Sequence, residues 1–496
     1  MKNSNRFKDR GFLLEPLIFE KRKDRSGYSL PPSEIGDKQP EELLPPHLVR
    51  SKLNEMPEVS ELEVVRHFTK LSQWNHSIDT AFYPLGSCTM KYNPKINERV
   101  AALPGFSFTH PEQPYSTVQG NLQLIFLLQK YLCDVFGMDA ISLQPAAGAQ
   151  GELTGMMLVH AYLMKRDQNP RKKILIPSSA HGTNPASAAL CGYQVVEIPA
   201  NDQGCLDTVA LNAVMNEDVA ALMLTNPNTV GLFEEEIVKI AGILHSKGGL
   251  VYLDGANMNA IVGIARPGDF GIDVMHLNLH KTFSTPHGGG GPGAGPVLVK
   301  SILEPFLPVP RVEENEGKFH LNYNYPDSIG KVHAFLGNFK VLVRAYTYLL
   351  AYGSDHVRNI AEFAVLNANY IRAKLKDTYY LPYDRPVMHE VIFSDKWQQK
   401  NDVRTLDIAK RLMDYGFHPP TIYFPLIVQG ALMIEPTESE SLETLDGFID
   451  AMKKIDEESR SQSELVRSAP HTTKISRLDE AEAARKPVLR WKPETA

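Results

Sequence analysis

The stretch His276-Leu-Asn-Leu-His-Lys281-Thr-Phe-Ser-Thr-Pro-His287-Gly-Gly-Gly-Gly-Pro-Gly293 decides how the rest of the chain is interpreted. A short apolar alternation leads directly into Lys281, and a glycine-rich turn follows. This pattern predicts a lysine at the end of a β-strand, where the glycines let the backbone approach a ligand closely. A lysine amine becomes nucleophilic when apolar surroundings lower its pKa, and Leu277, Leu279 and Phe283 are suitable neighbours. The position suits a lysine that forms a Schiff base.

The alternation also predicts which side chains share a face. If residues 276–281 are extended, His276, Asn278 and His280 lie on one face and Lys281 lies on the other. The two histidines have the spacing of a zinc-binding helix, but the residues between them include no glutamate and favour a strand. We therefore expect no metal site here. An ordinary surface lysine remains the alternative interpretation of Lys281.

The composition is that of a globular protein without a nucleic-acid partner. The 496 residues are 43% hydrophobic and 22% charged, and 52 basic against 58 acidic residues give a formal charge of -6. Such a chain is long enough for a large core and has no basic field that would attract nucleic acid.

The sequence also predicts the compartment. Its four cysteines, Cys88, Cys133, Cys191 and Cys205, form no CxxC pair, which favours a reducing environment over a disulfide framework. The apolar stretch at 12–19 is too short and too broken for a signal peptide, and no apolar run reaches the length of a membrane span. We expect a soluble cytoplasmic protein that does not bind membranes.

Residues 116–334 have the pattern of a large α/β domain. Apolar strands at 141–144, 173–177, 194–198, 219–225, 250–254 and 273–278 alternate with helical segments, notably at 119–138, 206–215 and 234–246. Such repeats predict a mostly parallel sheet covered by helices on both faces. Ligands of these sheets bind at the carboxyl ends of the strands. The polar residues at those ends are Gln144, His181, Asn226, Asp254 and Lys281.

The turn after the first strand predicts a phosphate site. Gly148, Ala149 and Gln150 lie between a strand and a helix start, where free backbone N–H groups and the helix dipole favour an anion. The sequence is neither GxGxxG nor a P-loop, so a tight turn selected for packing is the alternative.

Two of the strand-end residues suit a bound aromatic cofactor. Asp254 closes an apolar run, and a buried carboxylate needs a cation, for which a protonated pyridine nitrogen would serve. A turn or helix-capping aspartate is the alternative. His181 precedes a helix that Thr183 or Asn184 is expected to cap, and its imidazole could lie flat on an aromatic ring or move protons.

We expect three further segments around this domain. Residues 1–115 are broken by prolines and predict an arm with one helix near 59–72, in which the loop Pro84-Leu-Gly-Ser-Cys-Thr-Met-Lys91 either reaches an active site or only connects elements. Residues 335–460 predict a smaller α+β domain, with helices at 334–352, 355–376, 405–415 and 443–457. The polar, proline-broken residues 461–496 form a tail.

Longer motifs carry a family resemblance. They are Pro84–Met90, Ser179-Ala-His-Gly-Thr-Asn-Pro-Ala-Ser187, Tyr252-Leu-Asp-Gly-Ala-Asn-Met-Asn-Ala260, Arg266-Pro-Gly-Asp-Phe-Gly271, His276–Phe283 and the glycine run at 288–291. The phosphate turn, His181, Asp254 and Lys281, in this order, resemble the fold-type I pyridoxal-phosphate (PLP) enzymes. Over about 84–452 the motifs resemble, more narrowly, the glycine decarboxylase P-protein of the glycine cleavage system.

The resemblance covers only the lysine-bearing half of a full-length P-protein. It therefore implies the second (beta) subunit of a split enzyme, with the first (alpha) subunit as partner in a dimer of heterodimers. It also implies that glycine loses CO2 and that the aminomethyl group passes to the lipoyl arm of H-protein.

The resemblance also implies roles for single residues. Lys281 would carry PLP covalently, Asp254 would keep its pyridine nitrogen protonated, His181 would stack on the ring, and the turn at 148–150 would hold the phosphate. Asn226 lies in a matching motif and is assigned to the cofactor, and Thr89 and His287 are assigned to the substrate.

Two other functions stay open at this stage. One is a different PLP enzyme of the same fold, such as an amino-acid decarboxylase or a glycine-forming aldolase. The other is a non-catalytic subunit that binds the cofactor only to stabilise an assembly. The presence of both Lys281 and Asp254 argues against the second alternative, because a structural role requires no electron sink.

Overall fold

The computed structural model describes residues 14–21, 31–34, 36, 38–50, 57–167, 171–288 and 293–490. The chain forms two compact units, one of Met1–Thr80 with Ala469–Ala496 and one of Ala81–Ser468. This division differs from the four expected segments, because residues 81–115 join the unit that contains the sheets. Of the glycine run at 288–291, only Gly288 lies within the described residues.

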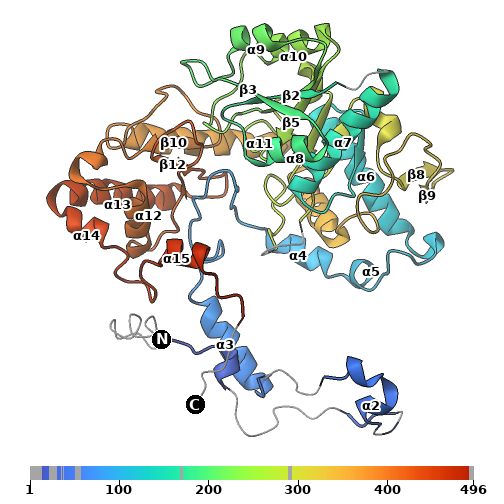
Figure 1. Ribbon diagram of the computed structural model, residues 1–496, viewed down its shortest axis with the longest axis horizontal. Coiled ribbons are helices and arrows are strands. Elements are labelled where there is room, and N and C mark those ends of the chain that lie inside the picture. Colours follow the sequence, from blue (N-terminus) through green and yellow to red (C-terminus); the bar gives the residue numbers. More distant parts are fainter. Residues whose placement is uncertain are drawn as a thin grey trace. The chain divides into compact units, whose positions relative to one another are not determined.

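A seven-stranded sheet forms the centre of the larger unit (Figure 1). Its strand order is β1-β7-β6-β5-β4-β2-β3, and β2 to β6 are parallel to one another. Strand β7, which the sequence analysis did not predict, is antiparallel to both of its neighbours. The strands are β1 Ala140–Ser142, β2 Lys173–Pro177, β3 Gln194–Ile198, β4 Val219–Thr225, β5 Leu250–Gly255, β6 Val274–Leu277 and β7 Val297–Val299. The expected mostly parallel α/β sheet is confirmed.

Helices cover both faces of this sheet. Helix α7 (Gly148–Arg166) packs on one face, and α6 (Gln119–Phe136) and α10 (Ile237–Ser246) contribute to the buried cluster on the other. Within β5, Tyr252 belongs to the cluster on the α7 side, and Leu253 belongs to the opposite cluster. Because strand side chains alternate, Asp254 lies on the α7 side. The connecting helices α8 (Thr183–Leu190) and α9 (Thr208–Val214) also lie where the sequence predicts helices.

A second, smaller sheet lies in the C-terminal part of the same unit. Strands β10 (Val391–Ser394), β12 (Ala431–Ile434) and β11 (Thr421–Ile422) are antiparallel in that order. Helices α12 (Thr405–Asp414), α13 (Leu442–Ser461) and α14 (Ser463–Arg467) complete this α+β region around a hydrophobic cluster of its own. The two expected helices at 334–352 and 355–376 are confirmed as the two halves of α11 (Phe339–Leu375), which meet at a kink where Gly353 has non-helical torsion angles.

The remaining elements of the larger unit are short. They are α4 (Lys95–Ala101), α5 (Pro104–Ser107), the hairpin β8 (Arg311–Asn315) and β9 (Lys318–Asn322), and the 3₁₀ helices η3 (Tyr115–Thr117), η4 (Pro267–Phe270), η5 (Ser301–Phe306) and η6 (Gln398–Asn401).

The described residues of the smaller unit bury little apolar surface. Helix α3 (Glu61–Ser72) confirms the expected helix and begins with a capping box between Ser60 and Glu63. None of the four buried hydrophobic clusters includes a described residue of this unit. Its other elements are η1 (Ile18–Lys21), α2 (Pro40–Leu43), η2 (Pro46–Leu48) and α15 (Glu480–Arg485).

A membrane span would need a long and apolar helix. None of the helices in the described parts of the chain meets both conditions.

Candidate active site

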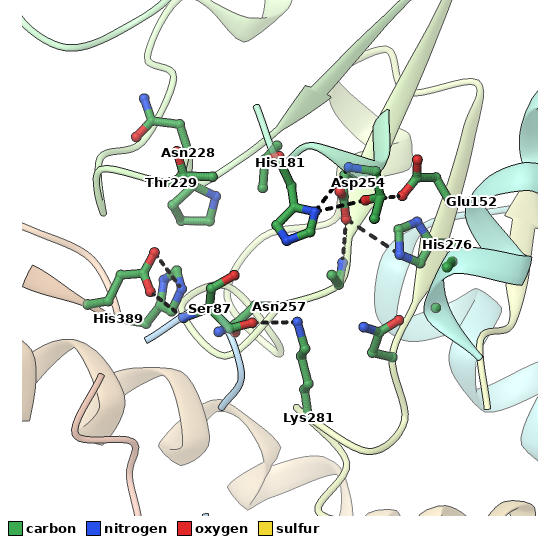
Figure 2. A pocket seen from close by; sticks show the side chains of 18 residues that line it. Ser87, Glu152, His181, Asn228, Thr229, Asp254, Asn257, His276, Lys281 and His389 are labelled. Atoms are coloured by element: carbon green, nitrogen blue, oxygen red, sulfur yellow. Dashed lines mark hydrogen bonds and ion pairs between the residues drawn. The ribbon is translucent and has the colours of Figure 1, made fainter. Parts of the chain in front are cut away.

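Three neighbouring strands bring polar side chains to one row at their carboxyl ends. In the parallel register, Thr225 of β4 lies opposite Asp254 of β5, and Asp254 lies opposite His276 of β6. All three residues line one cavity, to which Lys281 also contributes (Figure 2). The cavity therefore lies at the carboxyl ends of parallel strands, the edge at which such sheets bind ligands.

Asp254 is buried and held as a carboxylate. Its Oδ2 accepts a hydrogen bond from Asn184 Nδ2 at 2.9 Å, and its Oδ1 accepts one from the backbone N–H of Ala256 at 3.0 Å. Burial alone would raise the pKa of this carboxyl group, but His276, these two hydrogen bonds and Lys281 outweigh burial and leave the pKa below its usual value. The site therefore holds a negative charge that can pair with a cation.

His276 lies between Asp254 and the buried hydroxyl of Tyr252. Its Nε2 lies 3.4 Å from Asp254 Oδ1, and its Nδ1 lies 2.5 Å from the hydroxyl of Tyr252. Burial raises the pKa of Tyr252 well above 10, so the hydroxyl keeps its proton and donates to Nδ1. Burial also lowers the pKa of His276. A neutral imidazole that accepts at Nδ1 carries its proton on Nε2 and directs that N–H toward Asp254.

The N-terminus of α7 lies where the sequence predicts an anion site. Gly148 and Ala149 begin this helix and line the cavity, and no side chain caps the free N–H groups of the first turn. A Cβ atom at Gly148 would lie 2.0 Å from Oδ1 of Asn278, so a side chain there would displace the Asn278 amide, which also lines the cavity. Backbone donors and the positive end of a 19-residue helix thus face the cavity.

Lys281 enters the cavity from a turn and not from a strand. Strand β6 ends at Leu277, and the N–H of Lys281 bonds to the carbonyl of Asn278 at 3.0 Å. The expected face alternation is therefore wrong, since His276, Asn278 and Lys281 all line the same cavity. Lys281 is half-buried, and its ε-amine donates to the carbonyl of Ser87 at 2.5 Å. Figure 2 shows Lys281 directed toward Ser87.

His181 lies at the rim of the cavity, just before α8. Its Nδ1 accepts the backbone N–H of Thr183 at 3.2 Å, and its ring packs edge-on against Phe424 at a centroid distance of 5.6 Å. The expected cap by Thr183 or Asn184 is wrong, because the N-cap is Gly182 and makes no side-chain cap. Thr183 and Asn184 instead donate to Glu152 and Asp254.

Glu152 is a site residue that the sequence analysis missed. It lies one turn into α7, lines the cavity and is buried at 2% exposure. Burial and the charge of Asp254 raise the pKa of its carboxyl group to about 7. The only sequence signal was its position four residues after Gly148, which places both residues on one side of the helix start.

Four of the predicted residues do not line the cavity. Asn226 is fully buried, and its Oδ1 accepts the N–H of Glu234, whereas its neighbours Pro227 and Asn228 line the cavity. Gln150 bonds through Oε1 to the N–H of Ala146 within its own turn. The other two are Thr89 and His287.

Thr89 and His287 belong to a layer behind the cavity. The hydroxyl of Thr89 donates to Glu435 at 2.8 Å and accepts from Asn257, which does line the cavity, at 2.6 Å. Burial followed by the charge of Lys281 lowers the pKa of His287 to about 4. Their assignment to substrate stays a prediction.

Several polar atoms in the cavity wall have no protein partner. Among the described residues, these buried atoms include Glu152 Oε1, Thr225 Oγ1, Asn278 Oδ1 and His389 Nδ1. Unpaired buried groups of this kind are costly unless a ligand or water satisfies them.

The donor set fits PLP. An ionised buried aspartate suits a pyridinium nitrogen, a free helix N-terminus suits a phosphate, and an amine suits an aldehyde carbon. These three groups, contributed by Asp254, the start of α7 and Lys281, line the same cavity.

Two family models match the chain. Residues 32–310, more than half of the chain, match the glycine cleavage system P-protein, and residues 360–475 match the C-terminal domain of glycine dehydrogenase.

Curated relatives match over nearly the whole chain. A protein of Caldanaerobacter subterraneus subsp. tengcongensis named "Probable glycine dehydrogenase (decarboxylating) subunit 2" is 58% identical over 96% of this chain and 98% of its own length. Proteins with the same name from Bacillus cytotoxicus and Chloroherpeton thalassium are each 55% identical over 97% of this chain and 98% of their own lengths.

Solved structures share the fold. An inhibitor-bound glycine decarboxylase (P-protein) of the glycine cleavage system aligns with a TM-score of 0.70 at 20% identity over 85% of this chain and 96% of that chain. A Lactobacillus brevis glutamate decarboxylase aligns with a TM-score of 0.63 at 11% identity over 85% of this chain and 97% of that chain. The fold is that of the fold-type I PLP enzymes. The family model and the curated relatives show that the chain belongs to the P-protein family of the glycine cleavage system, in the subunit 2 branch.

Proposed function

We propose that this chain is the PLP-carrying subunit of a glycine dehydrogenase (decarboxylating). It binds glycine, releases its carboxyl group as CO2 and transfers the aminomethyl group to the lipoyl arm of H-protein. The observation that supports this proposal most directly is the shared cavity of Asp254, Lys281 and the free start of α7, in a member of the P-protein family. PLP would supply an electron sink for the pair of electrons left when the bond from Cα to the carboxyl group breaks.

The residues of the chain then have defined roles. Lys281 holds the cofactor covalently, Asp254 holds a proton on the pyridine nitrogen through its negative charge, and Gly148 and Ala149 donate backbone N–H groups to the phosphate. His181 places its ring at the rim, where it can cover one face of the bound ring. The Nε2–H of His276 holds Asp254 in place.

The cavity suits a small amino acid. No arginine lines it, so the described lining offers no bidentate clamp for a second carboxylate on the substrate. Asp254 contributes negative charge instead, which disfavours an acidic substrate side chain. Glycine, with no side chain, satisfies both conditions.

We further propose that subunit 1 completes the enzyme in a dimer of heterodimers. The curated relatives carry the name subunit 2 and match this chain over almost their full length, so they do not include a second half. We propose the cytoplasm as the compartment, because Cys88, Cys133, Cys191 and Cys205 are all free thiols, as expected in a reducing environment.

Isotope exchange tests the reaction. Labelled bicarbonate is supplied with glycine and lipoylated H-protein, using this chain alone and then with subunit 1, and label in the glycine carboxyl group is measured. Exchange that requires subunit 1 supports the proposal. No exchange with both subunits and bound cofactor would contradict the assigned reaction.

A separate measurement tests the attachment site. Lys281→Ala should abolish covalent attachment of PLP, measured by borohydride trapping and mass spectrometry of the peptides. Lys300→Ala is the control, because Lys300 lies outside the cavity and should leave attachment unchanged. Cofactor still trapped on the Lys281→Ala chain would show that another residue carries it.

A further inference from the structure

Two glutamates face each other behind Lys281. Strands β10 and β12 are antiparallel, with Val391 opposite Ile434. Continuing this register by one residue places Glu390 opposite Glu435, and both side chains are buried, at 3% and 0% exposure. A carboxylate oxygen of each lies within 4.8 Å of the other and of a ring nitrogen of His389. Like charges directly opposite in a ladder repel, so this pairing requires a reason.

The hydrogen-bond donors to this pair are neutral. Glu435 accepts from the hydroxyl of Thr89 at 2.8 Å and from Asn257 Nδ2 at 2.8 Å. Glu390 accepts the backbone N–H of Ser87 at 3.1 Å. Among the described residues, no lysine or arginine forms an ion pair with either carboxyl group. Two negative charges so close and so buried cannot both persist.

The titratable groups facing the pair are Lys281, His389, Cys88 and the buried Lys91, which is ion-paired with Glu438 at 2.6 Å. Burial lowers the pKa of His389 to about 3 and raises the pKa of the Cys88 thiol, so both are uncharged at neutral pH. Burial raises the pKa of Glu435 to about 7, and burial followed by the charge of Glu435 raises the pKa of Glu390 well above its usual value. Because Lys91 already pairs with Glu438, Lys281 is the nearby cation that has no carboxylate partner of its own among the described residues.

One short loop connects Lys281 to the glutamates. The ε-amine of Lys281 donates to the carbonyl of Ser87, and the N–H of the same residue donates to Glu390. Two residues further, Thr89 holds Glu435 through its N–H and its hydroxyl. Ser87 and Thr89 have positive φ angles of 66° and 49°, which non-glycine residues rarely adopt. Such backbone geometry persists where the surroundings over-determine it, often at functional sites.

We propose that Glu390 and Glu435 hold one proton between them and serve as the acid–base pair of Lys281. Through one bridging water, because neither carboxyl group forms an ion pair with the ε-amine, they accept the proton that the ammonium group loses before the amine attacks a carbonyl carbon, and they return it when the amine is released. In this step an N–H bond breaks, an O–H bond forms, and the electron pair stays on nitrogen. The proposal rests on the proposed attachment of PLP to Lys281.

Charge balance explains why two carboxyl groups are needed. With an ammonium group on Lys281, the singly protonated pair carries one negative charge and the cluster is neutral. With a neutral amine, both carboxyl groups are protonated and the cluster is neutral again. A single carboxylate would instead form a fixed ion pair that keeps the amine protonated. A metal cation at this cluster would face the ammonium group, which disfavours a metal site.

The first test uses the cofactor-free chain. Infrared spectra in D₂O at pH 7 distinguish the C=O band of a neutral carboxyl group from the bands of carboxylates. Glu390→Gln and Glu435→Gln should each remove intensity from the neutral-carboxyl band that changes with pH around neutrality. Glu234→Gln is the matched control, because it removes a different buried carboxyl group. Glu234 accepts hydrogen bonds from Asn228 and Leu206 and not from the loop at 84–91. Spectra in which neither variant differs from the wild type in this range would overturn the proposal.

The second test follows the attachment of added PLP at several pH values, by absorbance and borohydride trapping. In both variants the rate at pH 7 should fall about 100-fold, a typical loss for removal of an acid–base group. The rate of Glu234→Gln should stay close to that of the wild type. Wild-type rates in both variants would overturn the proposal.

Two further outcomes remain informative. If the wild-type chain never attaches PLP to Lys281, the proposed function fails, and the infrared result still decides whether the glutamates share a proton. If a glutamine variant does not fold, Glu435→Asp replaces it, because this variant retains a carboxyl group. The pH titration of the neutral-carboxyl band in the wild-type chain then decides whether the glutamates share a proton.

Discussion

His276 and Asp254 lie opposite each other in the parallel pair β5 and β6, with 3.4 Å between Nε2 and Oδ1. The neutral ring accepts from Tyr252 on its other side, so Asp254 receives an N–H group and not a competing positive charge. A protonated histidine would neutralise the carboxylate that the pyridine nitrogen needs. The network therefore keeps the negative charge of Asp254 available to a ligand.

Asp254→Asn should leave PLP bound but reduce bicarbonate exchange by about 1,000-fold, because the amide cannot hold a proton on the pyridine nitrogen. Asp273→Asn is the matched control. Asp273 directly precedes β6, at the opposite end of the strands, and its carboxylate accepts from His245 and from the N–H of Val251. The control should lose stability without a comparable loss of turnover per folded chain. Near-normal exchange by Asp254→Asn would show that this residue does not hold the proton on the pyridine nitrogen.

Tyr252→Phe should destabilise the cofactor-free chain by about 1–3 kcal/mol, because Nδ1 of the buried His276 loses its donor. It should also weaken PLP binding, since the imidazole can then move its proton to Nδ1 and present a lone pair to Asp254. Tyr379→Phe removes another buried hydroxyl, which donates to the carbonyl of Met452. Urea unfolding should show similar losses for both variants, whereas fluorescence titration should show weaker PLP binding only for Tyr252→Phe. Equal affinities would contradict the inferred tautomer.

The pH dependence of stability tests Glu152. Its folded-state pKa of about 7 lies above the usual value of 4.5, so the folded chain binds the proton more tightly than the unfolded chain. The resulting stability is present below about pH 4.5 and is lost as pH rises to about 7. The free energy of unfolding of Glu152→Gln relative to wild type should therefore increase by about 2–3 kcal/mol from pH 4.5 to pH 8.

Urea unfolding of both cofactor-free chains at the two pH values measures this difference. Asp207→Asn is the control, because Asp207 caps α9 at the surface and should show no comparable change over this range. A pH-independent difference between Glu152→Gln and wild type would show that folding does not raise the pKa of Glu152.

Local patterns in the sequence predict most of the fold and the principal site residues. Strand and helix positions follow from apolar periodicity, and Asp254 and Lys281 meet because the carboxyl ends of β5 and β6 lie at one edge of the sheet. The face of Lys281 was mispredicted, because the alternation argument requires a continuous strand. The turn from Asn278 to Lys281 ends β6 and changes the direction of the lysine.

The missed residues depend on pairings that no local pattern contains. Glu390 and Glu435 come together only through the antiparallel ladder of β10 and β12, and Ser87 reaches Lys281 from 194 positions earlier in the chain. For Glu152, the only signal in the sequence was its position close to Gly148. Strand β7 was not predicted, because a short apolar run after a glycine-rich segment shows no periodicity by which a strand can be recognised.

Gly148→Ala should weaken PLP binding at least 100-fold in a chain that still folds. The added Cβ would lie 2.0 Å from Asn278 Oδ1, so either the Asn278 amide or the start of α7 must move, and either change disturbs the cavity wall beside the free N–H groups. Gly242→Ala in α10 is the matched control, because a Cβ there meets no atom within 4 Å and alanine favours helix by about 1 kcal/mol. Phosphate should protect the wild type and Gly242→Ala against thermal unfolding, but not Gly148→Ala. If phosphate protects all three chains equally, the anion site does not lie at the start of α7.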